Sequence, residues 1–143
     1  MKFIRILVSL SLFAFALSLV SAQTAQTPQA ICDAAGPGEL TEMKFDAPEQ
    51  VLEAGVDYRA IFCTSAGAIY IDLFEDQTPI TVNNFVFLAQ QSYYDGTTFH
   101  RVMESFMAQG GDPTATGTSG PGYQFEDEPV GFLIFDQPGK LAM

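Results

Sequence analysis

The clearest alternation of side chains along the chain runs from residue 58 to residue 74. Two β-rich segments, Tyr58–Thr64 and Ala68–Phe74, flank the short sequence Ser65-Ala66-Gly67, which favours a tight turn. In the second segment the positions alternate as in a strand with one buried face, with Ile69, Ile71 and Leu73 on one side and Tyr70, Asp72 and Phe74 on the other. The pattern predicts an antiparallel hairpin with one face packed against a core.

A change of period after Thr78 predicts a helix. Thr78-Pro79 combines an N-cap residue with a proline suited to the first helical turn. Over the following residues apolar side chains recur at helical spacing, at Val82, Phe85, Val86 and Ala89. Phe87 and Leu88 widen this apolar face, so we expect much of the helix to be covered.

Beyond this helix the pattern is that of short strands and loops. Asp95-Gly96 predicts a turn, and short strands are expected at Thr98–Val102 and Phe106–Gln109. The sequence GGDPTATGTSGPG, residues 110–122, lacks the features of a phosphate-binding loop and predicts a permissive connection. The acidic run Glu126–Glu128 lacks the alternating ligands of a calcium loop, so we interpret it as a solvated turn.

The N-terminus has the pattern of a signal peptide, residues 1–22. Lys2 and Arg5 precede the uncharged apolar run Ile6–Val20, and Val20-Ser21-Ala22 is typical of a signal peptidase site. The run of 15 residues is short, and a membrane-spanning helix needs about 20, which favours a cleaved signal over a membrane anchor. We therefore expect export to the periplasm or the cell exterior, without stable membrane association after cleavage.

The remaining chain is long enough for one small domain. Residues 23–57 are rich in Gln, Thr, Ala, Pro and Gly and show little apolar periodicity, which predicts an N-terminal arm or linker. The strand and helix patterns begin after it, so the domain is expected at residues 58–143.

The chain is strongly acidic, with 17 Asp and Glu residues against six Lys and Arg and a net charge of −11 at pH 7. Loss of residues 1–22 would remove Lys2 and Arg5 and leave a net charge of −13 (4 − 17). Nucleic acids and anionic membranes are bound through basic patches, so this balance argues against both as partners.

Two cysteines, Cys32 and Cys63, are candidates for a disulfide. In an oxidising compartment a pair of cysteines is bridged more often than free, but spacing alone does not place them within bonding distance. The alternative of a metal site is weaker, because two cysteines and one distant histidine lack ligand spacing. We expect no metal and no cofactor.

One short stretch carries the most specific pattern in the chain. The single histidine, His100, stands beside Arg101 in Phe99–Val102, and FMAQGGDP, residues 106–113, follows shortly after. This spacing resembles the signature of the cyclophilin-type peptidyl-prolyl cis–trans isomerases. The similarity includes TVNNFVFLAQQSYYDGTTFHRV upstream and GPGYQFEDE and FDQPGKLAM downstream, and it covers Tyr58–Met143.

The resemblance implies both a fold and an activity. The fold would be mainly β, a closed, eight-stranded antiparallel barrel capped by helices. The activity would be isomerisation of X-Pro bonds, which assists protein folding, with proline-containing polypeptide segments as partners and no cofactor. A complete protein of this kind is expected to be a monomer.

By the same resemblance, Arg101 corresponds to the catalytic arginine and His100 to its neighbour at the edge of the active site. Bond rotation transfers no proton, so general acid–base work by His100 is not required. At the twisted transition state the prolyl nitrogen becomes pyramidal. A fixed donor such as the guanidinium of Arg101 would stabilise that state more than either planar one.

Four further positions correspond to residues that contact the substrate. Phe106 and Met107 would line the proline pocket, Gln109 would contact the substrate backbone, and Gly117 would skirt the substrate. Taken singly, such residues are more often core, strand-end or loop positions. Their joint spacing favours a proline site.

The family pattern continues beyond Met143 with an Ala-Asn pair, a Gln-Phe-Phe strand and further pocket residues. The domain is therefore expected to be incomplete at its C-terminal end. Two alternatives to an isomerase stay open: a non-catalytic module that binds proline peptides in the same groove, and an inactive fragment that lacks the second half of that groove.

Overall fold

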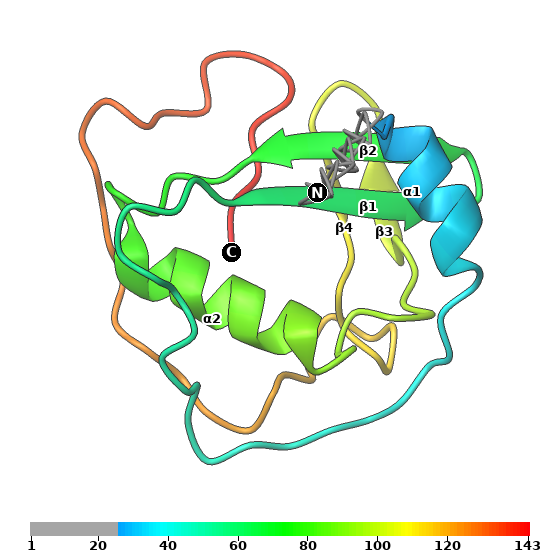
Figure 1. Cartoon of the computed structure of the whole chain (residues 1–143), viewed down its shortest axis with the longest axis horizontal. Coiled ribbons are helices and arrows are strands. Elements are labelled where there is room, and N and C mark those ends of the chain that lie inside the picture. Colours follow the sequence, from blue (N-terminus) through cyan, green and yellow to red (C-terminus); the bar gives the residue numbers. More distant parts are fainter. Residues whose placement is uncertain (1–25) are drawn as a thin grey trace, which may run out of the picture.

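The structure is a computed structural model that describes residues 26–143 (Figure 1). The signal peptide expected at residues 1–22 lies outside the described residues. Within the described range two helices and four strands form, joined by long connections. No helix in residues 26–143 is long and apolar enough to span a membrane.

The predicted first hairpin is confirmed. β1 (Arg59–Thr64) pairs antiparallel with β2 (Gly67–Asp72), from Arg59 opposite Asp72 to Thr64 opposite Gly67. The expectation of a buried face on β2 is wrong for Ile69, which is 44% exposed. Ile69 shares its face with its partner Phe62, whose ring centroid lies 6.0 Å from that of Phe85 in the following helix.

The predicted helix is also confirmed, but its cap differs from the expected one. α2 (Pro79–Gln90) follows Thr78, whose side chain makes no capping hydrogen bond. Instead, the Glu128 carboxylate accepts from the backbone N–H of Ile80 at 3.1 Å and of Thr81 at 2.6 Å. The acidic run interpreted as a solvated turn thus caps α2, because a carboxylate satisfies free N–H groups at the positive end of a helix.

α2 buries a surface that its apolar spacing only partly predicts. Its buried residues are Val82, Asn83, Asn84, Phe87 and Leu88. Ala89, predicted to face the core, is exposed, because the arm packs over the side that carries Asn83 and Phe87. Phe87, Leu88 and Tyr93 form the core, and four partly buried side chains pack against them: Met43, Phe45, Val51 and Tyr94.

A second hairpin follows α2. β3 (Arg101–Met103) pairs antiparallel with β4 (Met107–Gln109). Both strands are shorter than the segments predicted at 98–102 and 106–109. Ser105 has a left-handed φ of 59° and the Phe106 N–H donates to the Met103 carbonyl at 3.1 Å, so the turn takes up residues that could otherwise extend the strands.

The closed eight-stranded barrel implied by the family resemblance is not formed by the described residues. They contain two separate two-stranded sheets, β1–β2 and β3–β4. A barrel requires every strand to pair on both sides, whereas each of these strands pairs on one side only. The architecture described here is therefore two hairpins and two helices around a small core.

A helix that the sequence analysis did not predict lies in the arm. α1 (Pro28–Ala35) begins after Thr27, whose hydroxyl accepts from the Ala30 N–H at 3.2 Å. Thr27-Pro28 is the same pair of residue types that predicts α2 at Thr78-Pro79, so the signal was present in the sequence.

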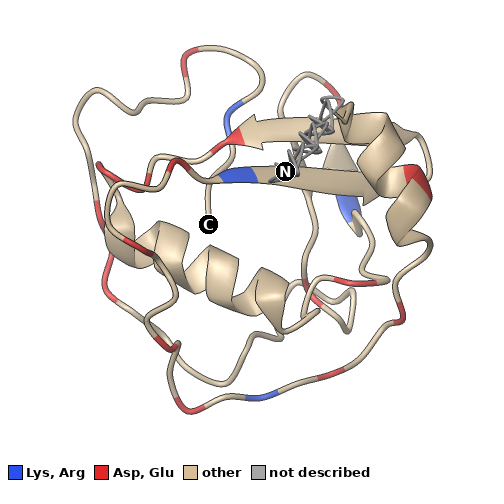
Figure 2. Ribbon diagram, in the orientation of Figure 1, with Lys and Arg blue, Asp and Glu red and all other residues tan. Residues whose placement is uncertain are grey.

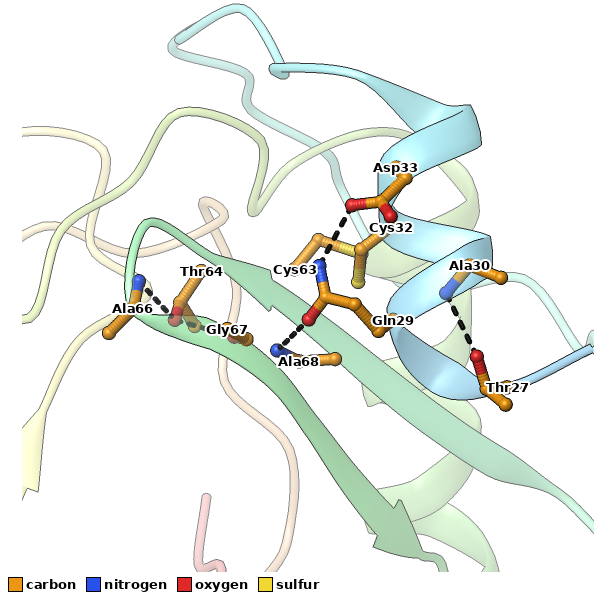
Figure 3. Close-up of a disulfide and its surroundings, with 10 residues drawn as sticks. All are labelled: Thr27, Gln29, Ala30, Cys32, Asp33, Cys63, Thr64, Ala66, Gly67 and Ala68. Atoms are coloured by element: carbon orange, nitrogen blue, oxygen red, sulfur yellow. Dashed lines mark hydrogen bonds between the residues drawn. A yellow bond between two sulfur atoms is a disulfide. The ribbon is translucent and has the colours of Figure 1, made fainter.

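A disulfide joins Cys32 of α1 to Cys63 of β1, with the two Cα atoms 5.1 Å apart (Figure 3). A hydrogen bond adds a second link, since Gln29 Oε1 accepts from the Ala68 N–H at 3.2 Å. Ala68 is the cross-strand partner of Cys63. Both links therefore hold the turn end of the first hairpin against α1.

Candidate functional site

The β3–β4 hairpin carries three of the predicted site residues. Arg101 lies directly opposite Gln109, and Met103 lies opposite Met107. Residues opposite each other in an antiparallel pair, and residues two apart along a strand, project from the same face. The register therefore puts Arg101, Met107 and Gln109 on one face of this hairpin.

The side chain of Arg101 is exposed. The two ion pairs found within residues 26–143 both belong to another arginine, Arg59, with Asp57 and Asp72 as partners. Arg101 thus forms no ion pair with the described part of the chain. A guanidinium stays charged at any relevant pH and offers several donors in one plane, so Arg101 can direct donors at a bound molecule.

His100, Gln109 and Gly117 lie close together. A Cβ placed on Gly117 would be 3.3 Å from His100 Nε2 and 3.5 Å from Gln109 Nε2. Gly117 also has φ +76°, a conformation that favours glycine. The loop therefore approaches the histidine and the glutamine with bare backbone, and a side chain at this position would occupy the space between them.

The imidazole of His100 is distinctive among these groups. Both of its ring nitrogens are buried, and neither has a hydrogen-bond partner in residues 26–143. Buried polar atoms normally find a partner. The ring therefore lies beside Gln109 and Gly117 with both nitrogens left free by the described chain to hydrogen-bond to another group.

The two apolar residues expected to line a pocket are less enclosed than predicted. Phe106 is 75% exposed, while Met107 is half-buried. Phe106 precedes β4 in the turn, where most of its surface stays exposed. An open hollow of about 490 Å³ lies elsewhere, lined by residues 44–49 and Phe87.

A residue without a predicted role organises the neighbouring loop. The buried carboxylate of Asp112 accepts hydrogen bonds from the backbone N–H groups of Thr114 (2.7 Å), Thr116 (3.2 Å), Gly117 (2.7 Å) and Ser119 (3.4 Å). It also accepts from the hydroxyls of Thr114 (2.8 Å) and Thr116 (3.2 Å). An Asp followed by small hydroxyl residues is a turn signal in sequence, but that signal does not predict how many groups converge.

The hydrogen bonds also fix the charge of Asp112. Burial alone would raise the pKa of its carboxyl, but the bonds from Thr114, Gly117 and Ser119 outweigh burial and hold the pKa well below its usual range. The loop is thus built around an ionised carboxylate. No cation is paired with that carboxylate in residues 26–143.

The described part of the chain is acidic overall. Figure 2 shows Asp and Glu distributed around much of the described chain, with few Lys and Arg between them. Among residues 26–143 no group of three or more His, Cys, Asp or Glu is arranged to hold a metal ion. The chemistry available at the hairpin is therefore that of an arginine, an amide and an imidazole beside apolar side chains.

Comparison with known proteins supports the family resemblance carried by the sequence of the β3–β4 hairpin. The family model described as cyclophilin-type peptidyl-prolyl cis–trans isomerase/CLD matches residues 59–143. The chain is 48% identical to peptidyl-prolyl cis–trans isomerase A of Mycobacterium tuberculosis, over 56% of this chain and 52% of that protein. It is 51% identical to a peptidyl-prolyl cis–trans isomerase of Synechococcus elongatus, over 59% of this chain and 57% of that protein.

A mammalian relative shows the same extent of similarity. The chain is 49% identical to the peptidyl-prolyl cis–trans isomerase-like 1 protein of Mus musculus, over 56% of this chain and 50% of that protein. The chain thus spans about half the length of the curated relatives that it matches. No solved structure matches it. The resemblance drawn from FHRV and FMAQGGDP is confirmed, and the chain belongs to the cyclophilin-type peptidyl-prolyl cis–trans isomerase family.

Proposed function

We propose that this protein is a peptidyl-prolyl cis–trans isomerase that accelerates rotation about X-Pro bonds in exported proteins and so assists their folding. The observation that carries the proposal is the pairing of Arg101 opposite Gln109, with Met107 on the same face. The names of the relatives support the same activity.

The chemistry needs no nucleophile, metal or proton transfer. The barrier of ~18–20 kcal/mol to rotation arises from lost amide resonance, and uncatalysed exchange takes tens to hundreds of seconds. In the twisted transition state the prolyl nitrogen regains a lone pair. Arg101 is assigned the role of donor to that nitrogen, since an interaction present only in the twisted state lowers the barrier.

Arg101 alone does not account for a fast isomerase. One charge-assisted hydrogen bond is worth about 1.5–3 kcal/mol, or one to two decades of rate. The remainder is assigned to the groups that hold the peptide. Phe106 and Met107 would grip the proline ring, and Gln109 would hold the substrate backbone while the bond turns. His100 is assigned a place at the edge of this site, beside Gly117.

Export belongs to the same proposal. The disulfide between Cys32 and Cys63 supports it, because disulfides persist in oxidising compartments and are rare in the cytosol. The substrates would then be proline-containing segments of proteins that fold after export.

The proposal is tested with two variants and one proline peptide. Arg101→Ala should lower the isomerisation rate at least about tenfold and change the peptide dissociation constant much less, because the lost bond exists only in the twisted state. Phe106→Ala should lower rate and affinity together, since an apolar contact holds the planar and twisted prolyl ring alike. Exchange spectroscopy on the peptide measures the rate, and a titration measures the dissociation constant.

The same experiment separates the alternatives. A protein that binds the peptide without accelerating exchange is a binding module, and its Arg101→Ala variant would leave the exchange rate unchanged. A protein that neither binds nor accelerates exchange would be an inactive fragment. Either result would reject the isomerase.

A further inference from the structure

The loop after β4 folds around one side chain. The Asp112 carboxylate accepts six hydrogen bonds, all from residues 114–119. Asp112 is only 7% exposed. A buried carboxylate with many N–H and O–H donors forms charge-assisted bonds that are stronger and shorter than neutral ones. The loop therefore depends on this charge for its shape.

The loop would not hold this shape through its own backbone preferences. Ala115 has φ 55°, a left-handed conformation that costs free energy for a residue with a Cβ, and Gly117 has φ 76°. The N–H groups of Thr114 and Gly117 both point at Asp112, each at 2.7 Å. The carboxylate compensates for the unfavourable backbone conformation by collecting the N–H groups on its two oxygens.

The same contact places Gly117 in the site. The Gly117 N–H donates to Asp112 Oδ2. A Cβ on the same residue would point at His100 Nε2 (3.3 Å) and Gln109 Nε2 (3.5 Å). Asp112 follows Gln109 by three residues. The last residue of β4 thus carries the amide assigned to the substrate backbone, and the carboxylate that holds Gly117 opposite this amide follows three residues later.

We propose that Asp112 is a positioning residue of the isomerase site, which sets the width of the groove by holding Gly117 against His100 and Gln109. The inference rests on the proposed function. Asp112 itself touches no substrate in this proposal. Its loss lets the loop move and weakens peptide binding, while Arg101 stays on β3, outside the loop, and the rotation step is largely preserved.

The test compares an isosteric change at Asp112 with the same change at an exposed carboxylate. Asp112→Asn replaces one acceptor oxygen by an NH₂ group that faces donors, so the loop loses either the two hydrogen bonds to Oδ1 or the four to Oδ2. Asp136→Asn is the matched control, because Asp136 is exposed and makes no hydrogen bond within residues 26–143. In the full-length protein, Asp112→Asn should raise KM for a proline peptide at least about fivefold and change kcat less than twofold. Asp136→Asn should match the unmutated protein in both constants.

A second pair of variants covers the case in which Asp112→Asn does not fold. The Thr114 hydroxyl donates to Asp112 Oδ1 at 2.8 Å. Thr114→Val removes that donor at constant shape and should raise KM about two- to threefold. Thr114→Ser restores the donor and should return KM to the unmutated value. The Gly117 amide resonance should shift in Thr114→Val and not in Thr114→Ser.

The outcomes separate this inference from the proposed function. If the unmutated protein and Asp136→Asn accelerate exchange, while a folded Asp112→Asn keeps KM within a factor of two, the inference is rejected and the isomerase stands. Equal KM values for Thr114→Val and Thr114→Ser reject it in the same way. If the unmutated protein neither binds nor isomerises the peptide, the proposed function fails and the inference fails with it.

Discussion

A few buried polar side chains decide where the irregular segments of this protein lie. Asn83 is the clearest case, since its Oδ1 accepts from the N–H groups of Val51 (2.8 Å) and Leu52 (3.2 Å) and its Nδ2 donates to the Glu49 carbonyl (2.9 Å). Asn84, which is fully buried, accepts from the Tyr123 hydroxyl. Buried backbone groups need partners, and the Asn83 side chain supplies them for residues 49–52, while Asn84 holds the side chain of Tyr123.

The Glu128 carboxylate likewise provides partners for the free N–H groups at the start of α2. Burial raises the pKa of its carboxyl, but the hydrogen bonds from Thr81 and Ile80 outweigh burial, so the pKa is lowered from its usual value. A lowered pKa in the folded state means that the unfolded chain binds the proton more tightly. The contribution of Glu128 to stability is therefore complete above the unfolded pKa of about 4.3, and it is lost as the pH falls through the lower folded value.

We predict that Glu128→Ala lowers the free energy of unfolding by about 0.5–2 kcal/mol at pH 7, the range measured for loss of an N-cap. The difference from the unmutated protein should shrink as the pH is lowered through the range in which Glu128 becomes protonated. Urea unfolding at pH 7 and at a series of lower pH values measures it.

Glu126→Ala is the control, because Glu126 is a nearby exposed carboxylate that makes no hydrogen bond within residues 26–143. It should be close to neutral at every pH. A loss at Glu128→Ala that is the same at all pH values would contradict a role for the ionised carboxylate.

At the scale of elements, the N-terminal arm also binds the loop that follows β4. Lys44 donates to the Ser119 hydroxyl (3.1 Å) and the Gly120 carbonyl (2.6 Å), and the Phe45 N–H donates to the Pro121 carbonyl at 2.7 Å. These contacts reach the far end of the loop that Asp112 holds. The arm therefore packs along α2 and the glycine-rich loop, although it precedes the family match at residue 59.

α1 depends on its covalent link to the first hairpin. The helix has eight residues and buries none of them. Isolated helices of fewer than about 12–15 residues are marginal in water. Its attachment rests on the Cys32–Cys63 bond and on the hydrogen bond from Ala68 to Gln29.

We predict that the double variant Cys32→Ser, Cys63→Ser lowers the free energy of unfolding by about 3–4 kcal/mol. The disulfide closes a loop of 31 residues and so reduces the conformational entropy of the unfolded chain. α1 should lose protection from amide hydrogen exchange, while α2 should keep it up to the reduced global stability. Denaturant unfolding and hydrogen exchange measure the two effects.

Reduction of the unmutated protein with a thiol is the matched comparison and should reproduce the double variant. If both thiols react with an alkylating reagent before any reduction, the bond is absent and the prediction fails.

At the scale of the whole molecule, net charge and exposed apolar surface have opposite effects on association between copies of the protein. Several large side chains are strongly exposed, among them Phe106 (75%), Phe132 (72%) and Phe135 (72%). Exposed apolar patches favour association, whereas the net charge of −11 opposes it through repulsion between copies. Removal of Lys2 and Arg5 by signal cleavage would increase that repulsion.

We predict that the exported protein begins at Gln23. The apolar run ends at Val20, and Ala22 supplies the small residue before the cleaved bond. Expression in a host with a matching secretion pathway, followed by N-terminal sequencing of the periplasmic or extracellular fraction, tests it. Ala22→Arg should block cleavage at this bond. An intact Met1 in a membrane fraction of the unmutated protein would instead support an anchor.

The sequence by itself determined most of the local elements and the family. The sequence patterns predict the first hairpin, the helix after Thr78-Pro79 and two short strands, and the FHRV…FMAQGGDP motif identifies the family; the structure and comparisons agree. Arg101, Met107 and Gln109 could be grouped in advance because they lie within nine residues on one hairpin. Short-range periodicity and turn chemistry act between neighbours, so the chain order alone reveals them.

Only the tertiary structure decided the contacts between distant segments. The cap of α2 by Glu128, the Cys32–Cys63 bond and the approach of Gly117 to His100 join residues 17 to 48 positions apart. The absence of a closed barrel in residues 26–143 is also a tertiary fact. The physical reason is that a free N–H group, a thiol or a bare glycine has many possible partners in sequence, and packing of the whole chain selects one of them.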